Sequence, residues 1–235
     1  MKRDNKIFLI TGTSRGIGQS MALYFLEKGH TVIGCSRTDA NISNILYDHY
    51  KLDLSEEKDI LDFFKKIRGK YRYVDVLVNN AAINPVISNL SFISFQSIES
   101  VFKVNVFAPM LLIRESIKLM SRRKFGRIIN IGSMAVKHEV KGESLYTATK
   151  ASLNSITRII AKEVNKLGIT VNLIAPSAIR TELSGQIDPE ALRKVLELNA
   201  IPTFGDFNQV NSLIDFLVQE KSNGITGQLI YLGGA

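Results

Sequence analysis

The stretch "SLYTATK" (144–150) places a tyrosine and a lysine four positions apart, at Tyr146 and Lys150. On a helix, this spacing brings both side chains to the same face. A free phenol loses its proton only near pH ~10, but a neighbouring positive charge favours the phenolate and lowers that pKa. The pair could therefore move protons near neutral pH, with Tyr146 as the general acid. Because Tyr-x-x-x-Lys also arises by chance, the rest of the chain must support this hypothesis.

A glycine-rich stretch, "TGTSRGIG" (11–18), follows the apolar run "KIFLIT" (6–11) and precedes a segment of helical period. Glycines at this position let the backbone turn tightly, so that a pyrophosphate can rest on the amides of the helix N-terminus. The spacing is G-x-x-x-G-x-G rather than G-x-G-x-x-G, but its place after a buried strand is the one the motif requires. The residues predicted to bind a dinucleotide here are Gly12, Ser14, Arg15, Gly16, Ile17 and Gly18.

The stretch "CSRTDA" (35–40) follows the second predicted strand, where the adenosine ribose of a dinucleotide is expected. Ser36 is small and uncharged, and Arg37 offers a planar fork of donors to the 2′-phosphate of NADP. Arg15 could reach the same group. The alternative is that Asp39 accepts from a ribose hydroxyl and selects NAD, or that Arg37 is an ordinary surface arginine. We predict NADP(H), because Asp39 lies beyond the expected strand end.

Short apolar runs alternate with longer amphipathic segments along the whole chain. The runs predict strands at 6–11, 31–35, 50–54, 74–80, 127–133, 169–175 and 228–232. The segments 95–121 and 145–167 have helical period, and Pro109 could mark a kink or a join in the first. This alternation predicts one α/β domain over 1–235, a Rossmann-type doubly wound parallel sheet of about seven strands with helices on both faces.

Composition narrows the class of protein. The 235 residues carry a formal net charge of +8, but the basic residues are scattered and no nucleic-acid-binding motif is present. No apolar run is long enough to span a bilayer, and the apolar start reads as a strand rather than a signal peptide. The single Cys35 argues against a thiolate metal site. We expect a cytoplasmic protein without a membrane, nucleic-acid or metal partner.

Two further segments fall at strand ends, "NNAA" (79–82) and "INIGS", which ends at Ser133. Ligands of open α/β sheets bind outside the carboxyl ends of the strands, so both should lie on the side of the glycine loop. Together with Asp53, Asn105, "APSAIRTE" (175–182) and "ITGQLIYLGGA" (225–235), these segments resemble the short-chain dehydrogenase/reductase family over essentially the whole chain.

The resemblance implies a role for each matching residue. Tyr146 would protonate a substrate oxygen, Ser133 would orient it, and Lys150 would also hold the nicotinamide ribose. Asn105 would anchor a water that relays protons from Lys150. The remaining implied cofactor contacts are Asp53 at the adenine amine, Asn80 and Ala81 along the dinucleotide, and Ile179 and Thr181 at the nicotinamide carboxamide.

The chain is most similar to the 3-oxoacyl-(acyl carrier protein) reductase branch, through "TGTSRGIG" and "GITVNLIAP". Lys124 matches a basic position of that branch, whereas Leu167 replaces another. The chain also departs from the family at Ser177, where glycine is usual, at "TFGDF" after "IP" (201–202), and at Leu232. These differences concern the substrate side, where a small apolar lid is expected around 183–204.

The resulting hypothesis is an NADPH-dependent oxidoreductase that reduces a ketone, a 3-oxoacyl thioester above all, free or bound to a carrier protein. A sugar or polyol dehydrogenase of surface-glycan biosynthesis is the alternative enzyme, and a non-catalytic NADP(H)-binding sensor is the alternative from another class. Relatives commonly form tetramers through helices like 95–121 and 145–167, so a homo-oligomer, tetramer or dimer, is expected.

Overall fold

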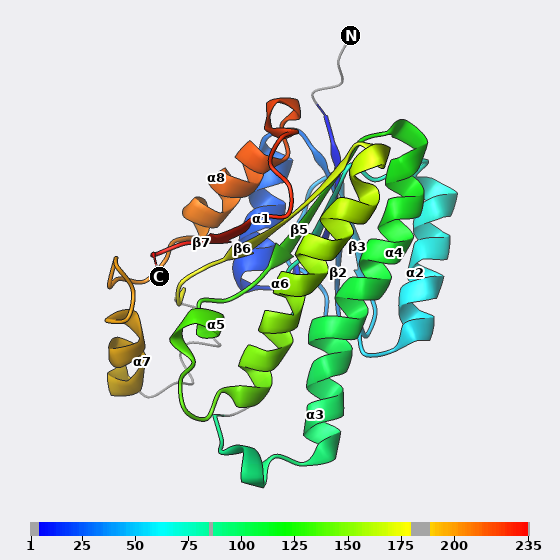
Figure 1. Cartoon of the computed structure of the whole chain (residues 1–235). Coiled ribbons are helices and arrows are strands. Elements are labelled where there is room, and N and C mark those ends of the chain that lie inside the picture. Colours follow the sequence, from blue (N-terminus) through cyan, green and yellow to red (C-terminus); the bar gives the residue numbers. More distant parts are fainter. Residues whose placement is uncertain (1–4, 85–86, 180–188, 235) are drawn as a thin grey trace.

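In the computed structural model, which describes residues 5–84, 87–179 and 189–234, seven parallel strands form one sheet in the order β3-β2-β1-β4-β5-β6-β7 (Figure 1). The strands are β1 (Ile7–Thr11), β2 (Thr31–Ser36), β3 (Tyr47–Lys51), β4 (Val76–Asn79), β5 (Gly126–Ile131), β6 (Ile169–Ala175) and β7 (Leu229–Tyr231). The order reverses between β1 and β4, and open sheets bind ligands in the crevice at such a reversal.

Helices cover both faces of the sheet. The helices are α1 (Gly16–Glu27), α2 (Glu57–Lys70), α3 (Phe95–Phe102), α4 (Ala108–Met120), α5 (Ala135–His138), α6 (Ser144–Val164), α7 (Pro189–Leu196) and α8 (Phe207–Leu217). Buried side chains of α2, α4 and α6 form one core layer with the sheet, and those of α1 and α8 form the other (Figure 1). The predicted doubly wound α/β fold is therefore confirmed.

The central strands are buried along their whole length, which explains their continuous apolar sequences. The edge strand β3 is different, because it spans Tyr47–Lys51 rather than the predicted 50–54. Its sequence, YDHYK, mixes polar and aromatic side chains that are half-buried or exposed, as suits a strand at the edge of the sheet. Leu52 and Leu54 suggested the later range, but both lie after the strand and are buried in the core layer beside α2.

The predicted long helix 95–121 is two helices joined by a wider turn. Residues Lys103–Phe107 form one π-helical turn, in which the amide of Ala108 donates to the carbonyl of Lys103. Pro109 lies just after this join and has no amide to offer the carbonyl of Asn105. Pro109 therefore marks a join, one of the two outcomes that the sequence allowed. Such π turns occur frequently at functional sites.

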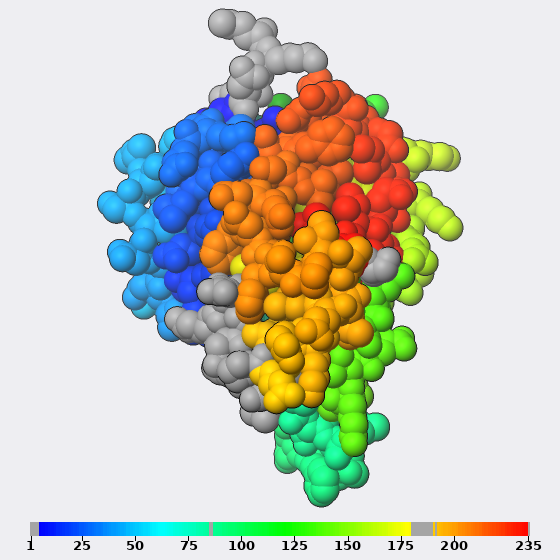
Figure 2. Space-filling model, turned by 90° about the vertical axis from the view of Figure 1, so that its left-hand side faces the viewer, coloured from blue at the N-terminus to red at the C-terminus, as the bar shows by residue number. Residues whose placement is uncertain are grey.

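The segment 189–205 stands below α8 on the face that Figure 2 presents, beyond the carboxyl ends of the strands. It contains α7 and returns to the sheet through a short parallel bridge between Ile179 and Gly205. Part of the predicted lid, 183–188, lies outside the described residues. Within the described ranges, we find no helix that combines the length and apolar character needed to cross a bilayer.

Candidate active site

The glycine loop connects β1 to α1, and its glycines are required by close contacts. Gly12 and Gly16 have positive φ angles of 75° and 59°, which L side chains rarely adopt. A Cβ atom added to Gly18 would lie 2.1 Å from the carbonyl oxygen of Gly12. The loop can therefore fold tightly against the start of α1, leaving the helix amides accessible to an anion.

Asn80 and Ala81 hold this loop from the end of β4. The side-chain amide of Asn80 donates to the carbonyl of Thr11 at 2.8 Å. The hydroxyl of Thr11 accepts from the backbone amides of Asn80 and Ala81 at 3.0 and 2.9 Å. Both residues border the cleft as predicted, but the Asn80 side chain is occupied in supporting the loop.

The predicted ribose end of the site follows β2, which ends at Ser36. The Ser36 hydroxyl donates to the carbonyl of Thr38 at 2.7 Å, so that proton is already used within the turn. Arg37 is exposed and borders the cleft. Asp39 lies three residues beyond the strand end, where its carboxylate pairs with the Lys51 ammonium at 2.7 Å.

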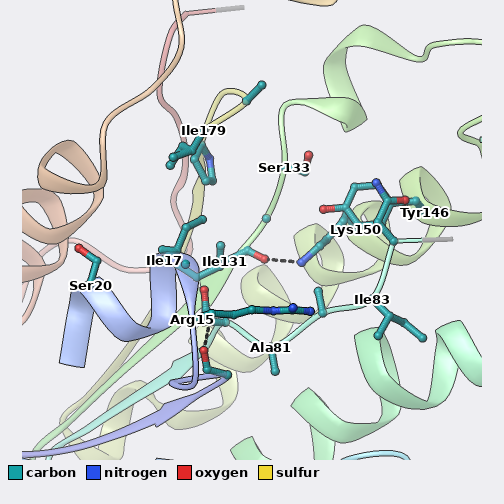
Figure 3. Close-up of a pocket in the computed structure, with 18 of the residues that line it drawn as sticks. Arg15, Ile17, Ser20, Ala81, Ile83, Ile131, Ser133, Tyr146, Lys150 and Ile179 are labelled. Carbon is teal, nitrogen blue, oxygen red and sulfur yellow. Dashed lines mark hydrogen bonds between the residues drawn. The ribbon is translucent and has the colours of Figure 1, made fainter. Parts of the chain in front are cut away.

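The predicted catalytic side chains meet at the opposite end of the cleft. Tyr146 and Lys150 lie in the first turns of α6, and Ser133 follows β5 (Figure 3). The Lys150 Nζ atom donates to the carbonyl of Ile131 at 2.8 Å and lies 5.8 Å from the centre of the Tyr146 ring. A phenol, an ammonium group and a hydroxyl therefore converge beside the glycine loop.

Burial dominates the electrostatics of the pair. It raises the pKa of Tyr146 to about 12, with the charge of Glu143 adding to the effect and a hydrogen bond with Ser133 opposing it. Burial also lowers the pKa of Lys150 to about 8. The protein alone therefore holds Tyr146 as a neutral phenol, because removal from water is the largest influence on its pKa.

Asn105 lies in the π turn behind this end of the cleft and is 1% exposed. Its side-chain oxygen accepts from the amide of Ile83 at 2.9 Å, and its side-chain amide donates to the carbonyl of Ile83 at 2.9 Å and to the Thr149 hydroxyl at 3.1 Å. The Asn105 side chain thus ties the join between α3 and α4 to α6, next to Lys150.

A single cleft of about 1720 Å³ connects the two ends. Pockets for drug-sized ligands occupy about 300–1,000 Å³, so there is room for a dinucleotide and a substrate together. All predicted site residues that the structure describes border this cleft, except Gly18 and Asn105, which lie just behind its wall. Asp53 and Ile179 are among those that border it, and Thr181 lies outside the described residues.

Sequence reasoning missed the polar groups around the substrate end. Asn199 is buried; its side-chain amide donates to the Ser177 hydroxyl and its side-chain oxygen accepts from His138 Nε2, both at 2.9 Å. Ser177, which stands where glycine is usual in the family, is therefore part of a hydrogen-bonded chain that also includes Asn199 and His138. Glu143 also borders the cleft, and within the described ranges its carboxylate has no hydrogen bond or ion pair. The sequence offered one indication of this place: Glu143 precedes Tyr146 by only three residues.

Comparisons with known proteins agree with this arrangement. The family model described as short chain dehydrogenase matches residues 6–192. The 3-oxoacyl-[acyl-carrier-protein] reductase of Buchnera aphidicola subsp. Schizaphis graminum is 32% identical, over 100% of this chain and 98% of the relative. The enzyme of the same name from Aquifex aeolicus is 30% identical, with the same coverage.

A solved structure described as 4-hydroxyisoleucine dehydrogenase complexed with NADH superposes with a TM-score of 0.91 and 30% identity, covering 98% of both chains. The chain belongs to the short-chain dehydrogenase family of nicotinamide-dependent oxidoreductases. Its curated relatives include 3-oxoacyl-[acyl-carrier-protein] reductases, the branch that the sequence resembles.

Proposed function

We propose that the protein is an NADPH-dependent reductase that converts the ketone of a 3-oxoacyl thioester into a secondary alcohol. The observation that carries this proposal is the meeting of Tyr146, Lys150 and Ser133 in the same cleft as the glycine loop. The 30–32% identity to 3-oxoacyl-[acyl-carrier-protein] reductases over the full chain supports the choice of substrate.

The glycine loop fits the pyrophosphate of a nicotinamide dinucleotide, because Gly12 and Gly18 let the loop pack against Asn80 and the start of α1 so closely that a Cβ atom at either position would collide. Arg37 and Arg15 border the cleft, and Arg37 follows β2, where the adenosine ribose is expected. Asp39 is the competing determinant for NAD, and its carboxylate is paired with Lys51. These features favour a 2′-phosphate on Arg37, with Arg15 able to assist.

The dinucleotide supplies hydride to the substrate carbon when it is bound. Tyr146, neutral up to a pKa of about 12, donates the proton that the carbonyl oxygen gains. The Ser133 hydroxyl orients that oxygen by a hydrogen bond. Lys150, whose pKa of about 8 lies near neutrality, can return a proton to the tyrosine after each turnover.

A substrate panel tests the proposal. The wild-type chain should oxidise NADPH in the presence of the N-acetylcysteamine thioester of 3-oxobutanoate, and more slowly with simple sugars, followed at the nicotinamide absorbance. 4-Hydroxyisoleucine with NAD⁺ is the competing arm, since the solved structure with that description has the same fold. Activity in that arm alone, or in the sugar arm alone, contradicts the proposed substrate, and NADPH binding without turnover in any arm favours the sensor.

Coenzyme choice has its own test. Arg37→Asp should lower the ratio of kcat/KM for NADPH to that for NADH by about tenfold or more, because a charge-assisted contact is lost and a like charge faces the phosphate. Arg72→Asp, at an exposed position before β4, is the control and should leave the ratio unchanged. An unchanged ratio in Arg37→Asp would assign recognition of the phosphate to Arg15 or another group.

A further inference from the structure

A chain of hydrogen bonds runs beneath the predicted ribose end of the cleft and links three separate segments. The Thr13 hydroxyl, in the glycine loop, lies 2.8 Å from the Tyr47 hydroxyl on β3. The Tyr47 hydroxyl lies 2.8 Å from His49 Nδ1. His49 Nε2 lies 2.9 Å from the carbonyl oxygen of Thr38 and 3.2 Å from the Ser36 hydroxyl. His49 therefore connects the glycine loop with the turn that carries Arg37.

The direction of each bond follows from the chemistry of its partners. A carbonyl oxygen only accepts, so Nε2 of His49 must carry the proton that points to Thr38. In the neutral ring Nδ1 is then an acceptor, and the Tyr47 hydroxyl must donate to it. Burial raises the pKa of Tyr47 to about 12, in keeping with a phenol that retains its proton. The Tyr47 oxygen is left to accept from Thr13.

The hydrogen bond between Thr13 and Tyr47 has space because residue 34, in the middle of β2, is a glycine. A Cβ atom there would lie 2.5 Å from the Thr13 hydroxyl oxygen and would collide with the Tyr47 hydroxyl as well. Thr13 itself is fully buried. The Thr13 end of these hydrogen bonds is therefore packed into the fold, whereas the bond from His49 to Thr38 lies at the surface.

These hydrogen bonds hold the residues on both sides of Arg37. The Thr38 carbonyl accepts from His49 and also from the Ser36 hydroxyl at 2.7 Å, so both neighbours of Arg37 in the sequence are held in the same turn. Since the Ser36 proton is used there, Arg37 is the one positively charged donor in the turn 36–39 that a phosphate could meet. The position of its backbone depends on the imidazole beneath it.

We propose that His49 is a positioning residue that sets the preference of this site for a 2′-phosphate. The inference rests on the proposed use of NADPH. His49 would act through the Thr38 carbonyl oxygen, 2.9 Å from its Nε2 atom, and so hold the turn that carries Arg37.

The test compares His49→Leu and His49→Gln with the wild-type chain, by fluorescence titration of NADPH and NADH at pH 8. His49→Leu removes the clamp and should lower the ratio of NADPH to NADH affinity by about fivefold, the effect of losing one structural hydrogen bond. His49→Gln can still donate to Thr38 and should restore most of the ratio at pH 8. NADH affinity reports that each variant is folded.

His30→Gln, at the opposite end of β2, is the control for loss of a histidine. This variant should keep the wild-type ratio of NADPH to NADH affinity.

Equal loss of NADPH and NADH affinity in His49→Leu would overturn the inference, since it would show a purely structural role. A ratio that stays at the wild-type value in both variants would overturn it as well. A wild-type chain that prefers NADH would contradict the proposed coenzyme, whereas a changed ratio in His49→Leu would still uphold the positioning role. The two failures are therefore distinguishable.

Discussion

The two ends of the cleft are built in different ways. At the nucleotide end the polar groups satisfy one another, as in Asn80 with Thr11 and in the chain from Thr13 to His49. At the substrate end, burial shifts the pKa of Tyr146 and Lys150, and the Glu143 carboxylate has no hydrogen bond or ion pair within the described ranges. The first end is preorganised by strand ends, and the second holds polar groups for which a substrate is the natural partner.

The difference separates the part of the cleft proposed to bind the cofactor from the part proposed to choose the substrate. The groups proposed to bind the dinucleotide and to move the proton lie at the ends of β1, β2, β4 and β5 and at the start of α6. The groups proposed to face the substrate come from the connection between α5 and α6 and from the segment 189–205. Connecting segments tolerate change better than strands do, so substrate choice can vary on a constant scaffold.

The largest effect should come from Tyr146→Phe. Loss of the only proposed proton donor should lower kcat by about a thousandfold, within the range for general acid catalysis, while NADPH affinity changes by less than about twofold. NADPH oxidation and fluorescence titration measure the two quantities. Tyr73→Phe, before β4 and away from the cleft, is the matched control. Turnover near the wild-type level in Tyr146→Phe would show that another group supplies the proton.

A smaller effect is expected at the nucleotide end from Gly18→Ala. The added Cβ would lie 2.1 Å from the Gly12 carbonyl oxygen, so the loop must shift and NADPH affinity should fall by about thirtyfold or more. Overpacking should also lower the free energy of unfolding by about 1–3 kcal/mol.

Gly69→Ala is the matched control for this change. Gly69 lies in α2 with no atom within 4 Å of its added Cβ, and alanine is favoured over glycine in a helix by about 0.5–1 kcal/mol. Denaturant unfolding should show a small gain in stability with unchanged NADPH affinity. Equal behaviour of the two alanine variants would contradict the close approach at Gly18.

The smallest effect is a shift in pH dependence for Glu143→Gln. The charge of Glu143 raises the pKa of Tyr146, so its removal should lower that pKa. Reduction requires the protonated phenol, and its alkaline decline should therefore move to lower pH. Oxidation of the alcohol requires the phenolate, and its rise should move to lower pH as well.

The pH profiles of kcat in both directions measure this shift, and Glu139→Gln, at an exposed position of the same connection, should leave them unchanged. A shift of the profiles to higher pH, or no shift, would show that the Glu143 charge does not reach the phenol.

The fold, and the place of the glycine loop within it, could be predicted from the sequence because both depend on local patterns. Continuous apolar runs marked the buried strands, and the glycine loop follows β1 directly. The edge strand β3 was misplaced because its exposed edge admits polar residues. The contacts of His49 and Asn199 could not be predicted, since each joins segments that only the folded sheet brings together.

The most direct test of the central claim is a crystal structure of the chain with NADP⁺ and the 3-hydroxyacyl product. We expect the pyrophosphate on the glycine loop, the 2′-phosphate on Arg37, and the Tyr146 hydroxyl within about 2.6–3.2 Å of the product oxygen. A dinucleotide bound elsewhere, or a product oxygen out of reach of Tyr146, would contradict the account.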